Sequence, residues 1–138
     1  MIKAILDTNI VISAALTPKG NSAKIIRLIA RDEIIKVYYS ADILAEYEEV
    51  LSRSHLNISN KVQSDIMNAI KEVGILIDPS VSDIPLPDES DRIFYDAAKE
   101  SGAILITGNT KHFSSEDFIM TPSQFLDFFK TNLVSDYF

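Results

Sequence analysis

Three carboxylates in this sequence have positions from which they could together hold a divalent cation. Asp7 directly follows the apolar run 2–6, Glu46 lies inside an expected helix, and Asp91 opens another. Such apolar runs are typical of buried strands in open α/β sheets, which present ligand-binding groups at their carboxyl ends. With no cysteine and only two histidines in the chain, oxygen ligands favour Mg²⁺ or Mn²⁺ over zinc. We predict a metal site with Asp7 and Asp91 as direct ligands and Glu46 bound directly or through a water.

Each carboxylate also has a structural alternative. Asp7 could bond its own backbone at the start of a loop, a common use of Asp after a strand. Glu46 could be a solvated helix acid. Asp91 could simply complement the positive end of its helix. The metal prediction therefore depends on the three residues converging in space.

Alternating strand and helix patterns must position these carboxylates. Apolar, β-branched and aromatic runs predict strands at residues 2–6, 34–39, 75–77, 103–107 and 118–120. Helical periodicity and capping residues predict helices at 10–16, from 21 or 22 onward, 40–53, 59–72, 91–102 and 123–130. A proline-bearing surface connection is expected at 79–87. The alternation predicts a three-layer α/β domain with a central, mostly parallel sheet.

Length, composition and charge narrow the class of protein. A chain of 138 residues with 46% hydrophobic residues is expected to form a single domain over 1–138. The absence of cysteine excludes disulfides and fits a reducing compartment, and no apolar run reaches the roughly 20 residues that span a bilayer. We therefore expect a soluble, cytoplasmic protein that does not enter a membrane. The net charge of −7 argues against nonspecific nucleic-acid binding, although acids around a cation are partly neutralised by it.

Four motifs in sequence order resemble those of the PIN domain family. They are Asp7-Thr8-Asn9, Ile43-Leu44-Ala45-Glu46-Tyr47, Asp91 at a helix start, and Thr107-Gly108-Asn109 followed by Lys111-His112-Phe113. The resemblance runs from Met1 to Phe125 and is strongest to the prokaryotic PIN toxins, relatives of the VapC toxins. It implies an α/β/α PIN-like fold, Mg²⁺- or Mn²⁺-dependent endoribonuclease activity on RNA, a homodimer and a cognate antitoxin. The chain would then be the toxin of a type II toxin–antitoxin system.

The same resemblance assigns one further residue, Asn109, to the catalytic site. Asn109 stands where many PIN domains carry a fourth aspartate. Because an amide brings no negative charge, a tightly held second metal is doubtful, and one tight Mn²⁺ site is expected in the absence of substrate.

Four other residues are expected to support the carboxylates. His112 and the aromatic residues near the C-terminus are expected to have other roles. Thr8, Asn9 and Thr107 can hold the carboxylates in place through hydrogen bonds, and Asp96 is a possible auxiliary acid at the pocket rim. We interpret His112 as a polar loop residue. The aromatic residues near the C-terminus are expected to serve packing or a dimer surface: Phe125, Phe128, Phe129, Tyr137 and Phe138.

Two other functions stay open. The first is a phosphohydrolase that uses Asp7 as a covalent nucleophile. Such enzymes usually carry a second Asp two positions later, where this chain has Asn9. The second is a noncatalytic PIN-like binding module whose acids have only structural roles. Added Mn²⁺ should leave the melting temperature of an inert module unchanged.

Overall fold

A five-stranded sheet forms the centre of the molecule, with strand order β3-β2-β1-β4-β5. The computed structural model describes residues 1–31, 34–113 and 116–137, the side chains of 133–137 excepted. The strands are β1 (Ile2–Leu6), β2 (Ile35–Tyr39), β3 (Ile75–Leu76), β4 (Ile104–Ile106) and β5 (Ile119–Met120). Each described pair of neighbouring strands is parallel. The chain proceeds from β1 outward to β3 and returns to β4 on the other side of β1. The sheet therefore has a topological switch point between β1 and β4.

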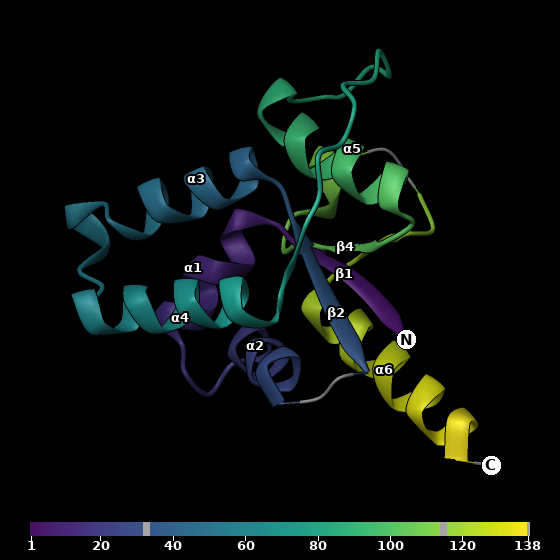
Figure 1. Cartoon of the computed structure of the whole chain (residues 1–138), viewed down its shortest axis with the longest axis horizontal. Coiled ribbons are helices and arrows are strands. Elements are labelled where there is room, and N and C mark those ends of the chain that lie inside the picture. The colour runs from purple at the N-terminus through teal and green to yellow at the C-terminus, as the bar shows by residue number, and fades with distance from the viewer. Residues whose placement is uncertain (32–33, 114–115, 138) are drawn as a thin grey trace.

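Six α-helices flank the sheet within the described part of the chain. They are α1 (Thr8–Leu16), α2 (Asn21–Arg31), α3 (Ala41–Leu51), α4 (Asn60–Val73), α5 (Arg92–Ser101) and α6 (Pro122–Tyr137). Figure 1 shows α5 on one side of the sheet, with α2 and α6 on the other. The expected three-layer α/β/α fold with a parallel sheet is confirmed. Each of these helices is too short or too polar to cross a bilayer.

Most helix boundaries lie close to the predicted residues, because local capping residues determine them. Ser40 caps α3, its side chain accepting a hydrogen bond from the Ile43 amide at 3.1 Å. Gly102 ends α5 in the left-handed region, at φ 73°, which glycine adopts without steric cost. The start of α1 lies at Thr8, two residues earlier than predicted, because the Asp7 side chain caps the helix.

The last helix is longer than the expected span of 123–130. It runs from Pro122 to Tyr137. The sequence after residue 130 contains no glycine or proline, and extending a helix costs little once its first turn exists. Phe125 and Phe129 are buried in the core, as packing residues should be, whereas the side chains of Tyr137 and Phe138 lie outside the described residues.

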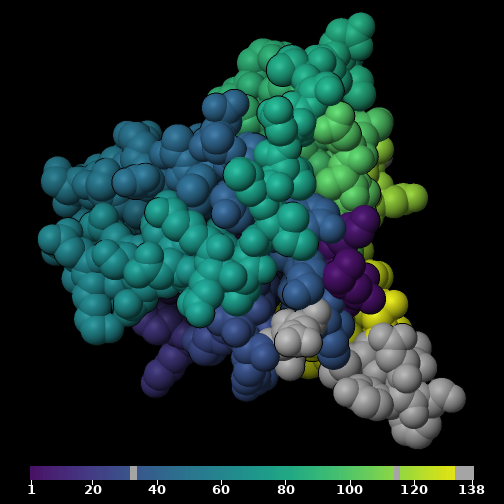
Figure 2. Space-filling view, in the orientation of Figure 1, coloured from purple at the N-terminus to yellow at the C-terminus, as the bar shows by residue number. Residues whose placement is uncertain are grey.

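The connection between α4 and α5 lies on the surface, as predicted. In Figure 2 the segment that follows α4 covers part of the face shown, in teal. Val81 within it is 83% exposed. The Arg92 guanidinium fastens this connection to α5, donating to the Ser82 carbonyl at 2.9 Å and the Ile84 carbonyl at 2.7 Å.

The core is densest around the central strand. Ala4, Ile5 and Leu6 of β1 are fully buried, as expected for a parallel strand covered on both faces. At the carboxyl end of β1 the chain continues into α1. Helix α1 contacts α3, and α5 contacts both α3 and β1. Residues that leave β1 at this end are therefore held by packed elements on several sides.

Candidate metal centre

Asp7 occupies the switch point of the sheet. Its amide donates to the Ile106 carbonyl at 2.9 Å, which ties the end of β1 to the end of β4. The side chain is almost fully buried, and its Oδ1 accepts a hydrogen bond from the Thr8 amide at 2.8 Å. Its Oδ2 accepts hydrogen bonds from the Thr107 hydroxyl at 2.8 Å and from the side-chain amide of Asn9 at 3.2 Å. The bond to its own helix start thus exists, but it accounts for only one of the two carboxylate oxygens.

Asn9 and Thr107 also connect the loops that follow β1 and β4. The Asn9 Oδ1 accepts a hydrogen bond from the Gly108 amide at 3.0 Å, and the Thr107 hydroxyl accepts one from the Asn109 amide at 3.1 Å. These are the contacts that the expected supporting role of both residues requires. They make the two loops one hydrogen-bonded unit around the Asp7 carboxylate.

Glu46 differs from the other acids on α3. Its Oε2 accepts a hydrogen bond from the Thr8 hydroxyl at 2.9 Å, and the side chain is half-buried. Glu48 and Glu49 on the same helix are exposed. Because Thr8 directly follows Asp7, this hydrogen bond brings Glu46 to the carboxyl end of β1. The structure thus places Glu46 beside Asp7 rather than on a solvated helix face.

Asp91 lies at the start of α5 but does not cap it. The residue is 8% exposed, and its side chain makes no capping hydrogen bond. Its Oδ2 is buried, has no hydrogen-bond partner among the residues that the structure describes, and lies 3.4 Å from Nδ1 of His112. A buried carboxylate oxygen without a partner is costly and calls for a specific explanation. Complementing the helix end does not supply one, whereas a bound cation would.

Burial disfavours the ionised forms of all three carboxylates. Burial raises the pKa of Asp91 to about 6, and the negative charge of Asp7 adds to the shift. Burial also raises the pKa of Asp7 above its usual value, against hydrogen bonds that include the one from Thr107. The pKa of Glu46 is raised by burial and, less strongly, by Asp7. A positive ion bound among these carboxylates would offset both the burial and the charge of Asp7.

Sequence reasoning missed two residues that the structure places beside Asp91. Within the described chain, one group of acidic and histidine side chains has ligand atoms all within 4.8 Å of one another: Asp88, Asp91 and His112. Asp7 and Glu46 are not part of it. The Asn109 amide nitrogen in turn lies 2.9 Å from Nε2 of His112. His112 stands in the motif Lys111-His112-Phe113 and Asp88 in the acidic run before α5, but neither position indicated that the two side chains meet beside Asp91.

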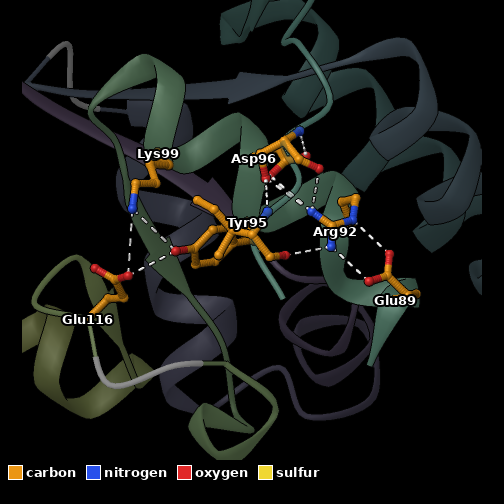
Figure 3. A network of polar contacts seen from close by, with 8 residues as sticks. Glu89, Arg92, Tyr95, Asp96, Lys99 and Glu116 are labelled. Carbon is orange, nitrogen blue, oxygen red and sulfur yellow. Dashed lines mark hydrogen bonds and ion pairs between the residues drawn. The ribbon is translucent and has the colours of Figure 1, made fainter. Parts of the chain in front are cut away.

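Asp96 is held by a different part of the molecule. Its two carboxylate oxygens accept hydrogen bonds from the Ser82 amide at 2.9 Å and the Ser82 hydroxyl at 2.5 Å. Arg92 approaches Asp96 at 3.8 Å and pairs with Glu89 at 2.7 Å, as Figure 3 shows. The visible role of Asp96 is thus to anchor the connection before α5, and a part at the metal site stays a prediction.

A pH dependence of metal binding follows from the raised pKa of Asp91. A protonated carboxyl must lose its proton to bind a cation, so affinity should fall as pH drops through about 6. We expect Mn²⁺ affinity to be about tenfold lower at pH 5 than at its plateau above pH 7. Calorimetric titrations at the two pH values measure this. A Mn²⁺ affinity that does not change between them would contradict Asp91 as a ligand.

Fold and site together define an α/β domain whose sheet gathers carboxylates suited to a divalent cation at its switch point. Comparisons with known proteins agree. A family model described as PIN domain matches residues 3–111. The chain is 37% identical over 120 residues to uncharacterized protein MJ1680 of Methanocaldococcus jannaschii, covering 84% of this chain and 76% of that protein.

This chain belongs to the PIN domain family, as its four motifs indicated. Its fold is similar to that of VapBC2 from Rickettsia felis, whose crystal structure was solved bound to a DNA fragment from their promoter. That match has a TM-score of 0.54 and 17% identity, and covers 87% of this chain and 97% of that chain. PIN domains are generally nucleases, and they use divalent metals.

Proposed function

We propose that this protein is a Mg²⁺- or Mn²⁺-dependent endoribonuclease that hydrolyses RNA phosphodiester bonds. One observation carries the proposal. In the described part of this PIN domain, the Oδ2 of Asp91 is buried without a hydrogen-bond partner, and the charges of Asp7 and Glu46 act on this carboxyl group. The oxygen donors of these three residues suit a hard dication, and the raised pKa values of the three carboxyl groups support the proposal, because a bound cation would favour their ionised forms.

Each residue has a distinct role in the proposed reaction. Asp7 and Asp91 hold the cation, which when bound supplies an activated water and neutralises charge on the phosphate. Thr8 fixes Oε2 of Glu46, so the other oxygen of that carboxylate can orient the attacking water. Asn9 and Thr107 keep Asp7 in one rotamer. These fixed positions remove the need to organise the site at the moment of reaction.

The partners belong to the same proposal. VapBC2 from Rickettsia felis, which has a similar fold, was crystallised bound to a DNA fragment from its promoter. By analogy we propose that this chain is the toxin of a type II toxin–antitoxin system, acts as a homodimer in the cytoplasm and is restrained by a cognate antitoxin. RNA, rather than the promoter DNA of that complex, would be its substrate.

The experiment that tests the nuclease is cleavage of total RNA by the purified protein with Mn²⁺, with Mg²⁺ and with a chelator. We expect fragments with either metal and none with the chelator. Thermal melting with and without Mn²⁺ accompanies it. An unshifted melting temperature together with no cleavage would favour the noncatalytic module. A covalent Asp7–phosphate intermediate would favour the phosphohydrolase.

Thr8→Val tests whether the Thr8 hydroxyl positions Glu46. The substitution keeps the side-chain shape and removes the donor to Oε2. Loss of a group that orients a metal-site carboxylate typically costs 10–100-fold, and we expect a decrease of about this size in cleavage rate. Thr17→Val, at the exposed far end of α1, is the matched control. Equal rates for both variants would show that Glu46 needs no such positioning.

A further inference from the structure

Asp88, Asp91 and His112 form a second group of potential metal ligands beside the predicted carboxylate site. We propose that they bind a transition-metal dication of their own, with Asp91 shared between the two sites. The sharing of Asp91 rests on the proposed function, whereas the binding of a dication by Asp88 and His112 can be tested without it.

The geometry of the group would let one ion contact all three residues. One ligand atom from each residue lies within 4.8 Å of the other two. The Oδ2 of Asp91 is buried, accepts no hydrogen bond from the described part of the chain, and lies 3.4 Å from Nδ1 of His112. A cation between these atoms would satisfy that carboxylate oxygen. The exposure of Asp88 and His112 leaves the cation a route from solvent.

Hydrogen bonds already fix the Asp88 carboxylate. Its Oδ1 accepts hydrogen bonds from the Ser90 amide at 3.0 Å and the Ser90 hydroxyl at 2.8 Å. These bonds lower the pKa of Asp88 below its usual value. They also set the direction of the carboxylate. The 3₁₀ turn Glu89–Asp91 then brings Asp91 next to it.

Asn109 orients the imidazole. Its amide group lies 2.9 Å from Nε2 of His112. The oxygen and nitrogen of an amide exchange places by a half-turn of the group, so Asn109 can also accept a hydrogen bond from Nε2–H. That tautomer leaves the Nδ1 lone pair facing Asp91, and metal-binding histidines usually have their second nitrogen held in this way. An amide at position 109, in place of a fourth carboxylate, thus serves the histidine.

The ligand types select the ion. Two carboxylates and one imidazole suit Mn²⁺ or Zn²⁺, since imidazole binds transition metals well and Mg²⁺ prefers oxygen ligands and its own waters. This site should therefore prefer Mn²⁺ and Zn²⁺ to Mg²⁺. It would also bring the number of Mn²⁺ ions to two, where the amide at position 109 alone had suggested one.

The two histidines of the chain allow a direct test by NMR. His55 lies on an exposed 3₁₀ turn, Ser54–Leu56, and serves as an internal reference. With ¹⁵N-labelled histidine, added Zn²⁺ should shift the Nδ1 resonance of His112, leave a proton on Nε2, and leave His55 unchanged. A His112 ring with both nitrogens protonated and no response to Zn²⁺ would be a simple ion pair with Asp91, and would overturn the inference.

Counting bound Mn²⁺ by electron paramagnetic resonance tests the same site in variants. His112→Ala and Asp88→Asn should each lose one ion or bind it at least tenfold more weakly, whereas His55→Ala should match the wild type. Full stoichiometry and affinity in His112→Ala would overturn the inference. The zinc shift is read from binding alone, so it can succeed when RNA cleavage fails. In that case the site stands and the proposed nuclease does not.

Discussion

Asp91→Asn should abolish metal-dependent RNA cleavage, with a rate at least about 1000-fold below wild type. The substitution keeps the shape of the side chain but removes a charged metal ligand, and metal stabilisation of the developing phosphate charge is worth several kcal/mol. Asp7→Asn should have an equal effect. The measurement is single-turnover cleavage of one RNA in Mn²⁺, with Asp127→Asn on the exposed side of α6 as the control. Wild-type turnover in both variants would contradict the assignment of Asp7 and Asp91 as metal ligands.

The same substitution should stabilise the metal-free protein. The folded-state pKa of Asp91, about 6, lies above the ordinary value of 3.8, so the folded protein binds the proton more tightly than the unfolded chain. The unfolding free energy therefore falls as pH rises from about 4 to 6, and the penalty is complete above that range.

Melting curves in chelator can measure this penalty. At pH 7.5, Asp91→Asn should gain about 1–2 kcal/mol, a value reduced for partial screening by solvent. Near pH 4 the gain should vanish, and an equal gain at both pH values would exclude ionisation of Asp91 as its cause.

Tyr47→Ala should cost about 3–5 kcal/mol of unfolding free energy, the range for a large aromatic residue removed from a core. Tyr47 is fully buried on α3 and stacks on Phe94 with ring centroids 6.3 Å apart. Its hydroxyl donates to the carbonyl of Leu6, the residue before Asp7. Chemical denaturation measures the loss.

Tyr47→Phe separates packing from positioning. It keeps the ring but leaves the buried Leu6 carbonyl without its donor, at a cost of about 1–3 kcal/mol. Because Asp7 directly follows that carbonyl, cleavage should also fall while the fold persists. Tyr38→Phe on β2, where the tyrosine is half-buried, is the matched control. A Tyr47→Phe protein with wild-type stability and cleavage would show that the hydroxyl has no part in placing Asp7.

Local features of the sequence were enough to predict most of the secondary structure. The apolar run before Asp7 predicted the central strand, and Ser40 and Gly102 marked helix boundaries at the right residues. These signals depend on a few neighbouring residues, through side-chain capping, backbone conformation and the alternation of apolar positions. The end of α6 was predicted wrongly because it has no strong local signal, and the start of α1 because the capping role of Asp7 was not recognised.

Long-range pairing decided the rest. The sequence alone determined that Asp7 follows a buried strand and that Asp91 opens a helix, and so indicated carboxylates for a cation. Only the tertiary structure, by pairing β4 with β1, brought Thr107 onto Asp7 and His112 onto Asp91. The physical reason is that strand order and loop position depend on packing between segments far apart in the chain, which no local pattern records. The partners of Asp91 therefore became visible only when the sheet was complete.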